Sequence, residues 1–229
     1  MKWLNKKSYP EYLLVMYLLL FIWSAISPKD YNVWLLEIIG VFFLIVVYIY
    51  FYKKIRFSNT TNTWFFIAAS LITVGAHYSF PNVPLFENLK GMFGFERNDF
   101  DKLGHVVQGI LPVLIAWEVL IKNHVVRNFY WINFLSLNIA LSVSAFYELF
   151  EWLFIVVLGD NSYTYDVLGT QGYVWDAQSD MLCALLGAIL TIFIGSKHLH
   201  KMINQSHSTH QKSTEKILIK KCHTSVATN

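Results

Sequence analysis

Six stretches of the chain are almost continuously apolar and are separated by polar segments. The hydrocarbon core of a bilayer is about 30 Å thick, so a helix needs about 20 apolar residues to cross it. We therefore predict an all-α, polytopic membrane protein with about six transmembrane helices. The expected spans are residues 12–26, 33–52, 64–78, 103–121, 129–158 and 177–195.

The fifth of these stretches, residues 129–158, is longer than a bilayer requires. At 1.5 Å per residue, a helix of this length measures about 45 Å. It is therefore expected to tilt, to project beyond the bilayer, or to break near residues 142–145.

The segment after the last span is polar and basic. We predict a transmembrane domain over residues 1–195 and a disordered cytoplasmic tail over residues 196–229. The tail contains five histidines, which leaves metal binding open as an alternative, although a solvated tail is the interpretation we favour. These histidines are His198, His200, His207, His210 and His223.

The composition excludes several other classes of protein. Of the 229 residues, 55% are hydrophobic and 14% are charged, whereas soluble domains carry about 25% charged residues. The net charge of +3 provides no basic face, so we expect no nucleic-acid partner. Cys183 lies in an apolar segment and Cys222 in the tail, which argues against a disulfide framework and a thiolate zinc site. The partner that the composition predicts is the lipid bilayer.

The distribution of basic residues predicts the orientation of the spans. If the N-terminus is cytoplasmic, 14 of the 18 Lys and Arg residues lie on cytoplasmic segments and four lie outside. Cytoplasmic segments of membrane proteins are enriched in Lys and Arg. We therefore predict that both termini are cytoplasmic, an N-in/C-in topology.

Ionisable side chains in the last three spans are expected to meet near the outer face of the membrane. An Asp at the centre of a membrane helix costs about 2.5–3.5 kcal/mol even on the mildest scale. Such residues should therefore turn toward one another rather than toward lipid. The candidate catalytic residues are Asp101, His105, Glu148, Glu151, Asp176 and Asp180.

The spacing of these residues suggests a chemistry. Asp101 and His105 are separated by four residues and share a helix face with Gln108, so Asp101 is expected to orient the imidazole. Imidazole combined with carboxylates suits zinc, manganese or iron. The cofactor stays open from the sequence, with a divalent metal as the candidate and His105, Glu148 and Asp180 as its candidate ligands.

Plainer interpretations exist for some of these acidic residues. Asp99 or Asp101 could cap the start of the span at 103–121, and Asp176 could cap the start of the span at 177–195. Glu118 precedes Lys122 by four residues, which predicts a structural ion pair away from the candidate site.

Four motifs resemble the YjdF family of bacterial inner-membrane proteins. They are HYSFPNVP (77–84), DKLGHVVQGILPVLIAWEVL (101–120), AFYELFEW (145–152) and LGTQGYVWDAQSDMLCALLGA (168–188). The resemblance covers residues 12–195 and implies a multi-pass protein of the bacterial inner membrane, without implying an activity. A looser resemblance links Asp101, Lys102, His105, Asp180 and Gly187 to VanZ-like membrane proteins.

Three classes of function remain open from the sequence. One is a membrane-embedded enzyme that acts on an envelope or lipid-linked substrate through the His/carboxylate site. A second is a proton-coupled transporter, although the chain has no matching pair of interrupted spans. The third is a structural or assembly protein in which the same residues form a polar network.

Overall fold

The chain folds as a bundle of helices. The computed structural model describes residues 9–159, 168 and 170–226, and for residues 205–226 it describes the backbone alone. No strand occurs in this part of the chain, so the all-α expectation is confirmed. The elements are α1 (Tyr9–Ser24), α2 (Tyr31–Tyr52), α3 (Asn59–Tyr78), the 3-10 helix η1 (Phe80–Asn82), α4 (Pro84–Phe93), α5 (Phe100–Lys122), α6 (Phe129–Leu158) and α8 (Asp176–Val226).

Four helices in the described ranges are long and apolar enough to cross a membrane: α2, α5, α6 and Asp176–Asn204 of α8. α1 is apolar but has only 16 residues. α3 has 20 residues, begins with the polar residues 59–62 and does not belong to this set. α6 is one uninterrupted helix of 30 residues, so the chain does not break near residues 142–145.

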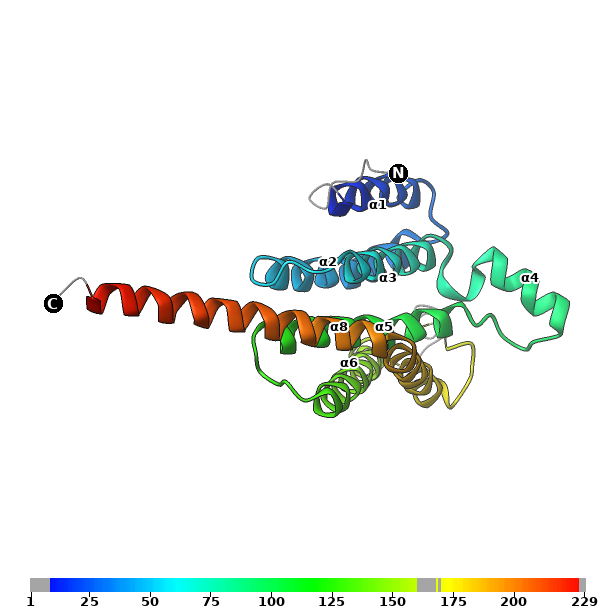
Figure 1. The fold of residues 1–229 in the computed structure, drawn as a ribbon. Coiled ribbons are helices and arrows are strands. Elements are labelled where there is room, and N and C mark those ends of the chain that lie inside the picture. Colours follow the sequence, from blue (N-terminus) through cyan, green and yellow to red (C-terminus); the bar gives the residue numbers. More distant parts are fainter. Residues whose placement is uncertain (1–8, 160–167, 169, 227–229) are drawn as a thin grey trace.

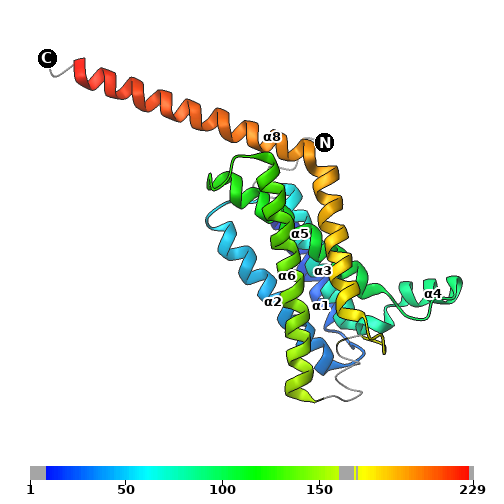
Figure 2. The same ribbon diagram turned by 90° about the horizontal axis from the view of Figure 1, so that it is seen from below.

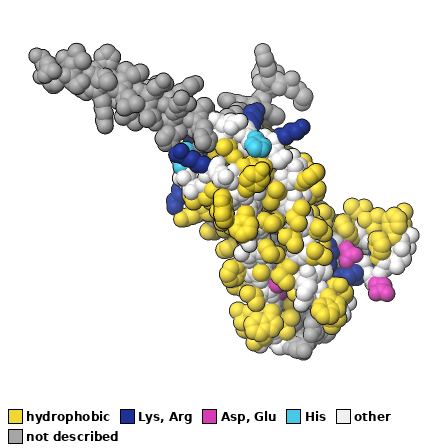
Figure 3. Space-filling model, turned by 60° about the horizontal axis from the view of Figure 1, so that its bottom comes forward, with side chains coloured by type: hydrophobic (Ala, Val, Ile, Leu, Met, Phe, Trp, Pro, Cys, Tyr) yellow, Lys and Arg dark blue, Asp and Glu magenta, His cyan; other side chains and the backbone are white. Residues whose placement is uncertain are grey.

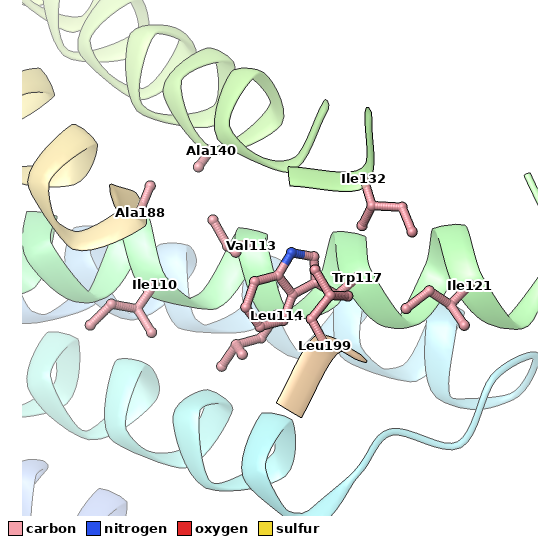
Figure 4. Close-up of a cluster of buried hydrophobic side chains, with 9 residues drawn as sticks. All are labelled: Ile110, Val113, Leu114, Trp117, Ile121, Ile132, Ala140, Ala188 and Leu199. Carbon is pink, nitrogen blue, oxygen red and sulfur yellow. The ribbon is translucent and has the colours of Figure 1, made fainter. Parts of the chain in front are cut away.

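The helices form two groups that meet at α3 and α5. In Figure 1, α1, α2 and α3 lie on one side of α5 and α8, and α6 lies on the other. The second group is built around Trp117 on α5, which is 1% exposed and packs beside Leu199 of α8 (Figure 4). The surface of the bundle is largely hydrophobic (Figure 3). In the most apolar 18-residue stretch of each helix, only 11% of the residues of α6 and 17% of those of α2 are buried. Such exposure suits a lipid environment.

Small residues let α5 and α8 pack backbone against backbone. A Cβ atom added to Gly109 would lie 1.9 Å from the carbonyl oxygen of Ala184, and one added to Gly187 would lie 2.2 Å from that of Val106. Glycine permits this close approach of helices in a membrane. The contact brings the first turns of α5 and α8 side by side.

The last helix continues beyond the bundle. α8 bends between its yellow and orange parts in Figure 2, and its C-terminal part points away from the other helices. Gly195 and Ser196 form the kind of pair at which helices bend, and Gly195 lies against the Trp117 ring. The backbone stays helical to Val226, and the disordered tail over residues 196–229 stays a prediction. The domain boundary at residue 195 stays a prediction.

Glu118 fastens the C-terminal half of α5 to the start of α3. Its carboxylate is 1% exposed, and it accepts hydrogen bonds from the Ser58 backbone N–H at 3.0 Å and from the Thr61 hydroxyl at 2.5 Å. Lys122 pairs with Glu118 and also donates to the Arg56 carbonyl at 2.8 Å. The predicted Glu118–Lys122 pair is therefore present, and it joins α5 to the connection between α2 and α3.

Removing this carboxylate should destabilise the bundle. In Glu118→Ala, the Ser58 N–H and the Thr61 hydroxyl lose their buried acceptor, which costs about 1–3 kcal/mol for such a group. We expect a lower midpoint in thermal unfolding of the detergent-solubilised protein. Glu87→Ala is the comparison, because it removes a solvent-exposed pair with Lys90 and one long hydrogen bond from Asn98 at 3.4 Å, and it should change the midpoint less. Equal midpoints for the two variants would contradict the anchoring role of Glu118.

Candidate functional site

Three helices bring ionisable side chains together at one end of the bundle. α5 contributes Asp101 and His105 from its first turns, α8 contributes Asp176 and Asp180 from its first turns, and α6 contributes Glu148. All five are less than 9% exposed, and Asp180 is only 2% exposed. The close contact of α5 and α8 at Gly109 explains how the two helix starts meet.

His105, Glu148 and Asp180 form a compact group of metal-ligand type. One ligand atom from each of the three lies within 4.8 Å of the other two. His105 Nδ1 is 3.7 Å from Glu148 Oε1, and His105 Nε2 is 3.6 Å from Asp180 Oδ1. These separations exceed those of hydrogen bonds. The three side chains thus lie close together without a direct hydrogen bond, with Glu148 beside Nδ1 and Asp180 beside Nε2 of the imidazole.

The orientation of His105 favours a lone pair that faces Asp180. Its Nδ1 lies 2.8 Å from the Gln108 Oε1, a carbonyl oxygen that can only accept a hydrogen bond. With the Gln108 amide oriented in this way, the proton of the neutral imidazole resides on Nδ1, and Nε2 is bare. Nε2 then faces Asp180 Oδ1 at 3.6 Å, an oxygen that also accepts a hydrogen bond from Lys102 Nζ at 2.6 Å.

Asp101 does not orient His105, which corrects the prediction from their spacing. Asp101 instead pairs with Arg97, whose Nη2 is 2.8 Å from Asp101 Oδ2. The residue that bonds the imidazole is Gln108, one turn further along α5.

Arg97 and Lys102 link the acidic residues into a network on the side of the helix starts. Lys102 Nζ is 2.8 Å from Asp176 Oδ1 and 2.6 Å from Asp180 Oδ1. Arg97 Nη1 is 2.7 Å from the same Asp176 oxygen. A second group of metal-ligand type, formed by Asp101, Asp176 and Asp180, therefore already surrounds the ammonium group of Lys102.

The Arg97 guanidinium keeps its charge in this setting. Burial opposes the charged form, but the hydrogen bond with Asp176 and the charges of Asp101, Asp176 and Asp99 outweigh burial and raise the pKa of Arg97. Tyr173 covers the cations, with its ring centroid 5.3 Å from Arg97 Cζ and 5.9 Å from Lys102 Nζ. Arg97 was not among the residues predicted for the site, although its spacing of four residues from Asp101 is a signal for a pair.

Negative groups outnumber positive groups in the cluster. Arg97 and Lys102 supply two positive charges, whereas the carboxyl groups number five: Asp99, Asp101, Glu148, Asp176 and Asp180. Glu148 Oε1 is buried and has no hydrogen-bond partner among the described residues. Buried polar atoms normally have a partner. The cluster is therefore suited to receive a further cation beside Glu148.

Glu151 is the one predicted site residue that the structure does not bring into either group. It lies one turn beyond Glu148 on α6 and is half-buried. Glu148 and Glu37 of α2 are both near enough to act on it electrostatically.

Asp99 and Asp176, which could have acted as helix caps, pair with basic side chains. Asp99 stands at the N-cap position of α5, but its side chain makes no capping hydrogen bond and pairs with Arg97 at 3.0 Å. Asp176 accepts bonds from Arg97 and Lys102. Both carboxylates thus take part in the ion-pair network.

Comparison with known proteins gives two matches and one negative result. A family model described as "Predicted membrane protein (DUF2238)" matches residues 9–201. The chain is 37% identical over 185 residues to "Inner membrane protein YjdF" of Escherichia coli (strain K12), and the alignment covers 80% of this chain and 88% of that protein. No solved structure gives a significant match.

Proposed function

The chain belongs to the DUF2238 family of predicted membrane proteins, and we propose, from the geometry of the His105 cluster, that it is a metal-binding protein of the bacterial inner membrane. The predicted resemblance to the YjdF family is confirmed by the 37% identity over most of the chain. A multi-pass inner-membrane location follows from this relationship and from the apolar helices. Neither the family description nor the relative's name carries an activity.

Our proposal for the topology is six spans with both termini in the cytoplasm. Each of the six apolar stretches largely coincides with one of the helices α1, α2, α3, α5, α6 and α8. In Figure 3, Lys and Arg side chains gather at the end of the bundle from which the C-terminal part of α8 departs. That clustering supports placing this end on the cytoplasmic side. The His105 cluster then belongs to the outer half of the membrane.

Cysteine labelling tests this topology. In a variant without Cys183 and Cys222, a cysteine at Glu96 should react with an impermeant maleimide in intact spheroplasts. A cysteine at Asn123, on the connection between α5 and α6, should react only after permeabilisation. Both positions are exposed, so accessibility on each side of the membrane decides the result. The reverse pattern would overturn the orientation and move the cluster to the cytoplasmic half.

The metal assignment rests on one observation: three buried ligand-type side chains from three helices converge within 4.8 Å around an unpaired Glu148 oxygen. One imidazole and two carboxylates suit zinc, manganese or iron. Three protein ligands also leave coordination positions open, as in catalytic rather than structural zinc sites. The ligands His105, Glu148 and Asp180 are therefore the ones we propose.

The reaction class that we propose is metal-assisted hydrolysis or group transfer on an envelope or lipid-linked substrate. A bound divalent ion polarises an oxygen of the substrate and lowers the pKa of a bound water. The proposed roles in the chain are ligation by His105, Glu148 and Asp180, and positioning of the imidazole by Gln108. Asp101 and Asp176 hold Arg97 and Lys102 at the edge of the site.

A structural network is the second candidate function, and the ion pairs of Lys102 favour it. Lys102 already neutralises Asp176 and Asp180, as it would in a cluster whose role is to hold α5 and α8 together. Metal analysis of the detergent-purified protein separates the two candidates. We expect about one divalent ion per chain, as for a three-ligand site. A protein that contains no metal and binds none of added Zn²⁺, Mn²⁺ or Fe²⁺ would contradict the enzyme proposal and favour the network.

A further inference from the structure

α4 is a short helix that projects sideways from the bundle (Figures 1 and 2). It has 10 residues, which amounts to about 15 Å and is too short to cross a bilayer. Pro84 stands at its start, and Gly94 ends it in the left-handed conformation with φ 70°. The helix is therefore a defined element rather than an irregular loop.

The apolar face of α4 points away from the protein. At 100° per residue, Leu85, Met92 and Phe93 lie on one side of the helix. These side chains are 65%, 76% and 64% exposed. Phe95 follows the helix, is 54% exposed and stacks on Phe93 with a centroid distance of 5.6 Å. A soluble amphipathic helix would bury this face against its own core.

The opposite edge of α4 fastens it to the start of α5. The Asn98 side-chain amide donates to the Val83 carbonyl at 3.2 Å and to Glu87 Oε2 at 3.4 Å. Phe86 packs edge-on against Phe100, the first residue of α5, with a centroid distance of 5.4 Å. The helix is thus held by its polar edge and by Phe86, and its apolar face stays uncovered in the described part of the chain.

We infer that α4 is an interfacial membrane helix, with Leu85, Met92, Phe93 and Phe95 immersed among the lipids of the leaflet that holds the His105 cluster. Two observations favour lipid as the occupant. The helix is attached at the start of α5, where the apolar span meets the polar network of Arg97 and Asp99. In Figure 3, hydrophobic side chains on α4 lie level with the hydrophobic surface of the bundle, and acidic side chains lie at its edge.

This arrangement matches the general build of interfacial helices, which bury an apolar face at the boundary between headgroups and acyl chains. The inference does not depend on the metal proposal. The orientation proposed above decides only that the leaflet is the outer one, and the lipid contact itself does not require it.

Fluorescence quenching from lipid tests the inference. In the full chain without Cys183 and Cys222, an NBD label is attached to Met92→Cys on the apolar face or to Gly91→Cys on the opposite side, where an added Cβ atom meets nothing within 4 Å. Both positions are exposed, so labelling should not disturb the fold. In phosphatidylcholine–phosphatidylglycerol vesicles that contain 5-doxyl phosphatidylcholine, the label at residue 92 should be quenched at least about threefold more than the label at residue 91. Iodide in the buffer should quench in the opposite order.

Two outcomes would overturn the inference. If both labels respond equally to iodide and neither responds to the doxyl lipid, α4 stands in water. If residue 92 is protected from both quenchers and Met92→Cys chains cross-link to each other as disulfide dimers, the occupant of the face is a second copy of the chain.

Discussion

Replacing His105 by alanine is expected to abolish the bound divalent metal while leaving the protein folded and inserted in the membrane. His105 supplies the single nitrogen in the group with Glu148 and Asp180, and its bare Nε2 faces Asp180 Oδ1 at 3.6 Å. Loss of an outer partner of a metal ligand typically costs 10–100-fold in affinity, so loss of a ligand itself should cost more than about 100-fold. Asp180→Ala should behave in the same way.

The measurement is metal content by elemental analysis, followed by titration of the stripped protein with Zn²⁺ or Mn²⁺. Gln108→Leu should weaken binding by about 10–100-fold without removing a ligand, because it frees the imidazole to rotate. Glu118→Gln is the matched control, since this carboxyl group is equally buried on the same helix but contacts the start of α3. Unchanged affinity in His105→Ala would remove the basis for the metal site.

Gly109→Ala is expected to separate α5 from α8 and to damage the fold and the site together. The added Cβ would lie 1.9 Å from the Ala184 carbonyl oxygen, and both atoms belong to packed backbone that cannot rotate away. Overpacking of this kind costs about 1–3 kcal/mol of folding free energy. Because His105 lies one turn before Gly109 and Asp180 one turn before Ala184, the two ligands should also move apart.

Gly104→Ala provides the comparison for this result. Gly104 lies next to His105 in the chain, but a Cβ atom there would meet no atom within 4 Å. The substitution should therefore leave the thermal midpoint and the metal affinity near those of the parent protein, with at most the small gain that alanine gives a helix. If the two variants have the same midpoint and the same affinity, the close contact between α5 and α8 is not a feature of the folded protein.

The variants His105→Ala and Gly109→Ala together distinguish the role of a ligand from the role of the helix contact that positions it. Alanine at His105 changes a side chain at the meeting point of three helices, whereas alanine at Gly109 changes the distance between two of them. Thermal stability should fall in the Gly109 variant and hold in the His105 variant. The pair of results thereby distinguishes loss of a ligand from loss of the helix contact that positions the ligands.

The sequence by itself determined the class of protein and the helices that build it. Apolar length is a local property, so residues 33–52 and 103–121 identified α2 and α5 without any tertiary information. The cost of charge in lipid was also enough to predict that His105, Glu148 and Asp180 meet. The pair of Glu118 with Lys122 followed from helical spacing, since both residues lie on one turn.

Only the tertiary structure decided which side chain contacts which. Gln108 rather than Asp101 bonds His105, Arg97 joins the network, and Glu151 belongs to neither group of metal-ligand type. The exposure of the apolar face of α4 could not be predicted from the sequence either, because an amphipathic pattern does not say whether its apolar side meets protein or lipid. These outcomes depend on how each helix is rotated about its axis and how closely its neighbours approach. That rotation is fixed by contacts between residues distant in the chain, such as Gly109 with Ala184, and a local pattern cannot encode them.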